Sequence, residues 1–72
     1  MDRIIIYTKT GCPYCRRVMD EYRARGISFE EVNLSLDLDA RHMVKERYRA
    51  DRVPVIVRDG DLVQIGDKNG MG

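Results

Sequence analysis

The 72-residue sequence predicts a single α/β domain built on a mixed four-stranded sheet. Three observations support this: a β-branched run opens the chain, apolar residues recur at helical spacing in two later segments, and a two-residue turn separates two further β-branched runs. The expected order is strand, helix, strand, helix, strand, strand (βαβαββ). It predicts a right-handed βαβ unit followed by an antiparallel hairpin.

The first strand and first helix are the most clearly patterned part of the chain. Residues 3–8 (RIIIYT) show no polar alternation, which is typical of a central strand covered on both faces. A helix is expected from Pro13, and Gly26 suits the position just after its end. Its apolar stripe consists of Cys15, Val18, Met19 and Tyr22.

The second strand and second helix follow. Residues 27–33 (ISFEEVN) predict a less regular strand, and Asp37 or Asp39 is placed to cap the next helix. The apolar stripe of that helix consists of Ala40, Met43, Val44 and Tyr48. His42 lies off this stripe and is expected on the surface.

The last third predicts a hairpin. Residues 53–58 and 61–65 are β-branched runs separated by Asp59-Gly60, a pair that favours a turn with positive φ. Pro54 cannot donate a ladder hydrogen bond and is expected at the mouth of its strand. Residues 67–72 are too few for another helix.

Composition limits the class of protein. Charged residues make up 35% and the net charge is +1, so no overall field points to nucleic acid or to a membrane surface. No apolar run approaches the ~20 residues of a membrane span, and no signal peptide is visible. We expect one cytoplasmic domain over residues 1–72.

Cys12 and Cys15 are the only cysteines and are expected to have unequal roles. A disulfide between them would close only a very short loop and would therefore stabilise the fold little, so a structural disulfide is disfavoured. Cys12 precedes Pro13 at the start of a helix, where free N–H groups and the helix dipole stabilise a thiolate. Cys15 lies on the apolar stripe, and burial keeps a thiol protonated. Cys12 is therefore expected to attack a disulfide and Cys15 to resolve the product.

A metal site is the alternative reading of the two cysteines. Structural zinc takes four N or S ligands, and this chain has two cysteines and one distant histidine, so we expect no metal in a single chain. Two chains that share their Cys12 and Cys15 thiolates could hold zinc or an iron–sulfur cluster.

The assembled residues resemble the glutaredoxin family. They are Tyr-Thr-Lys-x-x-Cys-Pro-Tyr-Cys at 7–15, Val-Pro at 53–54 and Ile-Gly at 65–66, within a likeness that covers residues 3–66. The resemblance implies the thioredoxin fold and a dithiol enzyme that reduces protein disulfides and glutathione mixed disulfides. Glutathione would be the co-substrate, with no bound cofactor.

The resemblance also assigns roles. It makes Cys12 the nucleophile that carries the glutathionyl group and Cys15 the resolving thiol. It makes Lys9 a partner of a glutathione carboxylate, and the Val53 backbone a partner of the bound peptide, with Pro54 in cis. The full set of glutathione contacts that it implies is Lys9, Tyr14, Val53, Pro54, Gly66 and Asp67.

Three departures from the family pattern stand out. Arg52 replaces the usual threonine before Val-Pro, and residues 67–70 (DKNG) replace a glycine and an acidic pair, so Asp67 is offset. The family's usual third helix is not found within residues 1–72, so we expect either that it is absent by nature or that the sequence has been cut. Alternate residues between 55 and 65 are therefore expected to be uncovered, which would allow a dimer of a chain otherwise expected to be a monomer.

Two other functions fit the same residues. One is an electron donor, for example to ribonucleotide reductase, recharged by thioredoxin reductase, although the C-terminal segment lacks the aromatic residue typical of such donors. The other is an iron–sulfur scaffold that bridges two chains, although Pro13 stiffens the loop where cluster-holding relatives have a small residue.

Overall fold

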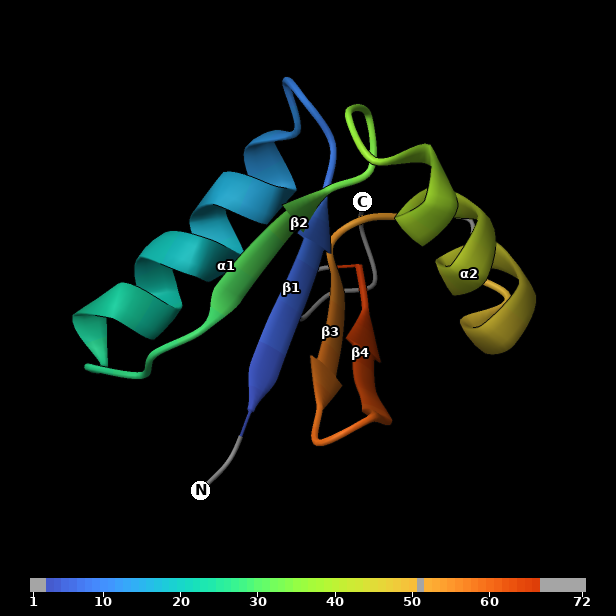
Figure 1. The fold of residues 1–72 in the computed structure, drawn as a ribbon. Coiled ribbons are helices and arrows are strands. Elements are labelled where there is room, and N and C mark those ends of the chain that lie inside the picture. The colour runs from blue at the N-terminus through green and yellow to red at the C-terminus, as the bar shows by residue number, and fades with distance from the viewer. Residues whose placement is uncertain (1–2, 51, 67–72) are drawn as a thin grey trace.

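The computed structural model describes residues 3–50 and 52–66. The elements are β1 (Ile4–Thr8), α1 (Pro13–Ala24), β2 (Glu30–Asn33), α2 (Leu38–Tyr48), β3 (Val55–Arg58) and β4 (Asp61–Ile65). The strands form one sheet in the order β2-β1-β3-β4 (Figure 1). β1 pairs parallel with β2 and antiparallel with β3, and β3 pairs antiparallel with β4. The predicted order of elements and the predicted βαβ unit and hairpin are confirmed.

The two helices flank the sheet (Figure 1). β1 is an inner strand, and Ile6 and Thr8 on it are 0% and 1% exposed. The core also contains the stripe residues Cys15, Val18 and Met19 of α1 and Val44 of α2. The apolar faces that the sequence predicted for both helices therefore point to the sheet.

Helix termini follow local chemistry. Cys12 is the N-cap of α1 and Pro13 is its first residue, where a missing N–H costs nothing. Beyond its C-cap, Gly26 has φ +71°, a conformation that glycine adopts without strain. For α2, the Ala40 N–H donates to Asp37 Oδ1 at 3.0 Å, which identifies Asp37 as the cap.

The β3–β4 hairpin turns on Asp59 and Gly60, with φ of 50° and 86°. Positive φ at both positions is what a two-residue turn needs to match the twist of its strands. The register shifts between Ile56 and Val57, which gives the ladder an irregularity. The side chains of both residues remain buried.

Two expectations about the sheet are corrected. The second strand begins at Glu30 and not at residue 27. Before that point the chain packs on α1 instead of pairing with β1, since the Phe29 ring contacts the Tyr22 ring edge-on with centroids 6.1 Å apart. The prediction of an uncovered β3 is wrong, since Val55–Arg58 is an inner strand with residues 55–57 at most 3% exposed. Apolar exposure falls on the edge strand β4, at Leu62 and Val63.

Neither helix in the described part of the chain is long and apolar enough to cross a membrane.

Candidate active site

Both cysteines lie at one end of the sheet, where β1 and β2 end and α1 begins (Figure 1). The loop that carries Cys12 is fixed by hydrogen bonds to its surroundings, and Cys15 lies in the first turn of α1. The Cys12 N–H donates to the Lys9 carbonyl at 3.3 Å, and Asn33 Nδ2 donates to Thr10 Oγ1 at 3.2 Å. The Thr10 N–H donates to Ser35 Oγ at 3.2 Å. The loop is therefore held on the segment that follows β2.

Cys12 is half-buried, and its sulfur caps α1. The Cys15 N–H donates to Cys12 Sγ, with 3.1 Å between nitrogen and sulfur. This N–H is one of the groups at a helix start that have no partner within the helix. A donor and a positive helix terminus at the same sulfur stabilise negative charge there, as a nucleophilic thiolate requires.

Cys15 has the opposite environment. Its side chain is in the core at 1% exposure, and both cysteines are reduced. Burial, and then its hydrogen bond to Cys12 and the charge on Cys12, raise the pKa of Cys15 to about 12, while backbone hydrogen bonds at Lys9 and Cys15 oppose this in part. Cys15 is therefore a thiol at neutral pH, as its place on the apolar stripe predicted.

The raised pKa of Cys15 in the folded protein predicts a loss of stability at alkaline pH. The ordinary Cys pKa is 9.0, so above pH 9 the unfolded chain loses a proton that folded Cys15 keeps up to about pH 12. The free energy of unfolding of the reduced protein should fall by about 1.4 kcal/mol per pH unit in this window because of Cys15. Urea unfolding of wild type and Cys15→Ala at pH 8 and pH 10 should show the difference between them shrink accordingly. The raised pKa of Tyr7 acts equally in both proteins, and a constant difference would contradict the assignment.

A hollow of about 620 Å³ opens beside the two cysteines, between α1 and β2. Its wall includes Glu31, whose Oε2 accepts a hydrogen bond from the buried Thr8 hydroxyl at 2.8 Å. The other residues around it are Lys9, Thr10, Gly11, Pro13, Arg16, Met19, Arg23 and Asn33. A space of this size accepts a small molecule or a peptide loop at the sulfurs.

A smaller hollow of about 120 Å³, the basic groove, lies on another side of the same loop. It is lined by Lys9, Leu34, Arg41, Val44, Lys45, Ala50, Arg52 and Val53. Four of these described residues are cationic and none is acidic, so the groove favours an anion. Val53 at its edge is 7% exposed and precedes Pro54 through a cis peptide bond, which is the geometry that the resemblance implied.

The structure places the predicted glutathione contacts unequally. Lys9 and Val53 meet at the basic groove. Tyr14 is half-buried with the Arg17 guanidinium 5.7 Å from its ring centroid, and it lines neither hollow. The buried Gly66 is held against Pro54, whose carbonyl accepts its N–H at 2.7 Å. Asp67 lies outside the described residues.

Arg41 and Lys45 were missed by the sequence reading. They stand four residues apart on α2, a spacing that puts both on one helix face. That spacing was visible in the sequence. Their position beside Lys9 and Val53 depends on how α2 packs and was not.

No group of three or more His, Cys, Asp or Glu suited to a metal ion exists within residues 3–50 and 52–66. Cys12 and Cys15 supply two sulfur ligands, fewer than the four that zinc or an iron–sulfur cluster takes. A cluster on these sulfurs would therefore need ligands from a second chain or another molecule.

A capping cysteine and a buried cysteine, three residues apart after the inner strand β1 of a β2-β1-β3-β4 sheet, are the arrangement of a thioredoxin-fold protein. Residues 4–63 match the model of the Glutaredoxin family. The chain belongs to the glutaredoxin family, whose members are thiol–disulfide oxidoreductases.

Individual relatives agree with this placement. The gene 56 protein of Mycobacterium phage L5 is 38% identical over 56 residues, covering 78% of this chain and 54% of the phage protein, so the chain spans about half of that relative. Glutaredoxin 3 of Escherichia coli K12 is 34% identical over 63 residues, covering 88% and 76% of the two chains.

Solved structures share the fold. The thioredoxin-like protein BC3987 superposes with a TM-score of 0.78 at 30% identity, covering 85% of this chain and 84% of its own. A buckwheat glutaredoxin–glutathione complex superposes with a TM-score of 0.77 at 20% identity, covering 90% and 61%, a likeness of fold alone.

Proposed function

We propose that this chain reduces disulfides, including glutathione mixed disulfides, through Cys12 and Cys15. The observation that carries the proposal is the pairing of a helix-capping sulfur with a buried thiol that remains protonated at neutral pH. An accessible sulfur at a helix start, next to a buried thiol that can attack it, is the arrangement that ordered disulfide exchange needs. A reducing compartment such as the cytoplasm, where thiols persist, is the setting that we propose.

The reaction starts at Cys12. Its thiolate attacks one sulfur of the substrate disulfide, the substrate S–S bond breaks, and the second substrate sulfur leaves as a thiolate that takes a proton. Cys12 is then neutral in a mixed disulfide. Two of the causes that raise the pKa of Cys15, the hydrogen bond to Cys12 and the charge on Cys12, both depend on the state of that sulfur.

The second step uses Cys15. Its thiol loses its proton to solvent and its sulfur attacks Cys12 Sγ, which releases the remaining substrate sulfur and leaves a Cys12–Cys15 disulfide. The substrate gains two electrons and the protein loses two. When the mixed disulfide holds glutathione, a second glutathione can instead attack the glutathionyl sulfur, which forms glutathione disulfide, breaks the bond to Cys12 Sγ and leaves Cys12 reduced.

Glutathione dependence is the finer part of this proposal. The basic groove places Lys9, Arg41 and Lys45 beside Val53, close to the loop that carries Cys12, and glutathione brings two carboxylates. Guanidinium and ammonium groups bind carboxylates through charge-assisted hydrogen bonds. Membership of the glutaredoxin family supports the same choice of donor.

Removing one charge from the groove tests its role. Arg41→Gln is expected to raise the KM for glutathione about fivefold with little change in kcat, because an exposed ion pair contributes up to about 1 kcal/mol to binding. The effect should shrink at 0.5 M salt. Arg47→Gln changes the net charge equally on the same helix but lies off the groove and should leave the KM unchanged. Equal effects of both variants would contradict a specific carboxylate site.

The electron donor is tested directly by supplying one reductant at a time. The purified protein should reduce a glutathionylated small-molecule disulfide with glutathione, glutathione reductase and NADPH. The competing donor is thioredoxin reductase with NADPH, favoured by the likeness to a solved thioredoxin-like protein of similar length. Turnover with thioredoxin reductase alone would keep the dithiol chemistry and overturn the glutathione part of the proposal.

A further inference from the structure

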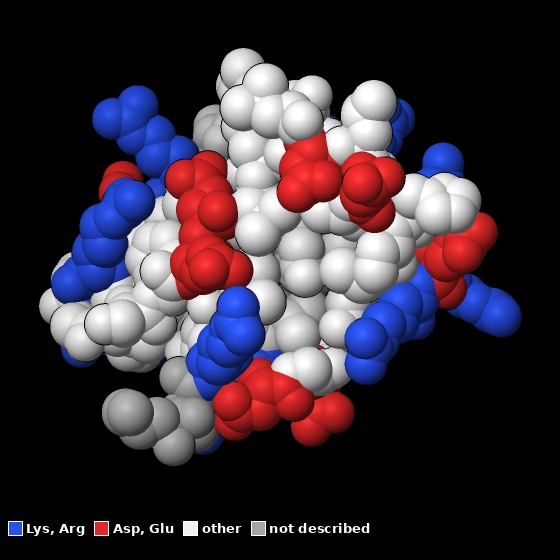
Figure 2. All heavy atoms as spheres, in the orientation of Figure 1, with Lys and Arg blue, Asp and Glu red and all other residues white. Residues whose placement is uncertain are grey.

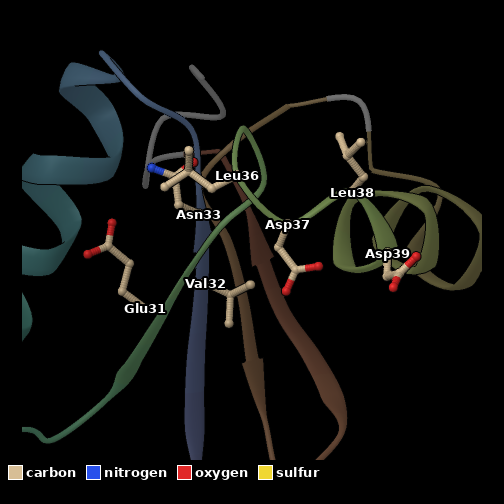
Figure 3. Close-up of a pocket in the computed structure, with 7 residues that line it drawn as sticks. All are labelled: Glu31, Val32, Asn33, Leu36, Asp37, Leu38 and Asp39. Atoms are coloured by element: carbon tan, nitrogen blue, oxygen red, sulfur yellow. The ribbon is translucent and has the colours of Figure 1, made fainter.

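A second surface beside the active-site loop combines exposed leucines with carboxylates (Figure 3). Leu36 and Leu38 are 82% and 68% exposed, the highest values among the large apolar residues of the described chain. They border a hollow of about 620 Å³ between β2 and the start of α2. We call it the acid–leucine surface, and its residues are Glu31, Val32, Asn33, Leu36, Asp37, Leu38 and Asp39.

The charged residues that line this surface are all acidic. Three of its residues are acidic and none of those that line it is cationic, in a chain of net charge +1. In Figure 2 several acidic side chains lie over the upper middle of the face, while its margins and lower part carry Lys and Arg together with further acidic side chains. Asp37 Oδ1 accepts the Ala40 N–H at the start of α2 and Glu31 Oε2 accepts the Thr8 hydroxyl, so hydrogen bonds hold both carboxylates in place.

The surface is continuous with the loop of Cys12. The Leu34 N–H donates to the Thr8 carbonyl at 2.7 Å, and Thr10 is bonded to both Asn33 and Ser35. The segment that carries Leu36 is therefore hydrogen-bonded to the segment that leads to Cys12. A protein that covers the leucines can therefore extend over the adjoining loop that carries Cys12.

We propose that the acid–leucine surface docks a cationic, apolar segment of a protein whose disulfide the chain reduces. The inference rests on the proposed function. Burying exposed leucines against an apolar partner favours binding, and a cluster of carboxylates attracts and selects a partner of positive charge. The basic groove includes Lys9 of the Cys12 loop, and the acid–leucine surface includes Asn33, which is bonded to Thr10 of that loop, so a protein substrate at Cys12 has surfaces of opposite charge within the same part of the molecule.

The test compares three disulfides. Two are twelve-residue peptides with the same internal disulfide, one flanked by Lys-Leu-Lys-Leu and the other by Glu-Leu-Glu-Leu, and the third is bis(2-hydroxyethyl) disulfide. Prereduced protein is mixed with each in stopped flow and the second-order rate constant of the single turnover is measured. The protein dithiol supplies both electrons, so no other reductant is needed. The lysine peptide should react about tenfold faster than the glutamate peptide at low salt, and 0.5 M salt should reduce the ratio.

Variants assign the preference to the surface. Asp37→Asn with Asp39→Asn removes two charges while Asn keeps the helix cap, and Leu36→Ser with Leu38→Ser removes the apolar contacts. Each pair should lower the rate for the lysine peptide at least threefold and leave that for bis(2-hydroxyethyl) disulfide unchanged. Asp61→Asn with Val63→Ser, exposed on β4 away from the site, is the matched control and should change neither rate.

The outcomes separate this inference from the proposed function. No reaction with any of the three disulfides would overturn the proposed function. Reaction with all three and no preference for the lysine peptide, or a preference that the control variant also loses, would overturn the docking surface alone. A wild-type dimer in sedimentation that Leu36→Ser with Leu38→Ser dissolves would assign the surface to a second copy of this chain and also overturn it.

Discussion

Cys12→Ser is expected to lower disulfide reduction by more than about a hundredfold. The thiolate is the nucleophile in disulfide exchange, and a serine hydroxyl in the same place is not. The other sulfur is no substitute, because Cys15 is 1% exposed and protonated at neutral pH. The measurement is the rate of NADPH oxidation in a coupled assay with a glutathionylated small-molecule substrate.

Cys15→Ser is the matched variant and should behave differently. Glutathione from solvent can resolve a mixed disulfide on Cys12, so reduction of a glutathione mixed disulfide should persist. Reduction of a peptide disulfide should be lost, because that route needs Cys15. Activity retained in Cys12→Ser, or both reactions lost in Cys15→Ser, would contradict the assigned roles.

Ile6→Ala is expected to destabilise the protein by about 2–5 kcal/mol. Ile6 is 0% exposed on β1 and pairs with Ile56 of β3 and Glu31 of β2, so truncation leaves a cavity in the middle of the sheet. Small domains are marginally stable, and such a loss is a large part of a total of about 5–15 kcal/mol. Urea unfolding followed by circular dichroism should show the midpoint fall sharply.

Two further variants calibrate that result. Ile6→Val removes one methyl group and should cost about 0.5–1.5 kcal/mol. Val63→Ala on the edge strand, where the side chain is 54% exposed, should stay within about 0.5 kcal/mol. Equal losses for Ile6→Ala and Val63→Ala would be inconsistent with a core centred on β1.

The architecture was predictable where a pattern repeats. The helical spacing of apolar residues predicted both helices, and Asp59-Gly60 predicted the hairpin, because these signals depend only on residues close together in the sequence. The start of β2 was misplaced because Phe29 has strand-like chemistry but packs on Tyr22, a tertiary contact. The burial of β3 was misjudged because it depends on the position of that strand inside the sheet, which the residues of the strand do not reveal.

The dithiol was predictable and its surroundings were not. Cys12 before Pro13 and Cys15 on an apolar stripe are local features, and the structure confirms both positions. The basic groove joins segments around Lys9, Arg41 and Arg52, which no spacing rule brings together. The acid–leucine surface was likewise not predictable, because a leucine is expected in the core and only the fold shows that Leu36 and Leu38 are exposed.

The sulfur of Cys12 is also a structural atom, since it closes the first turn of α1 by accepting the Cys15 N–H at 3.1 Å. A thiolate accepts such a bond strongly, and the neutral sulfur of a disulfide accepts it weakly. Each reaction cycle therefore weakens a helix cap and restores it. The exchange rate of the Cys15 amide hydrogen with solvent should differ between the reduced protein and the form in which Cys12 is in a disulfide.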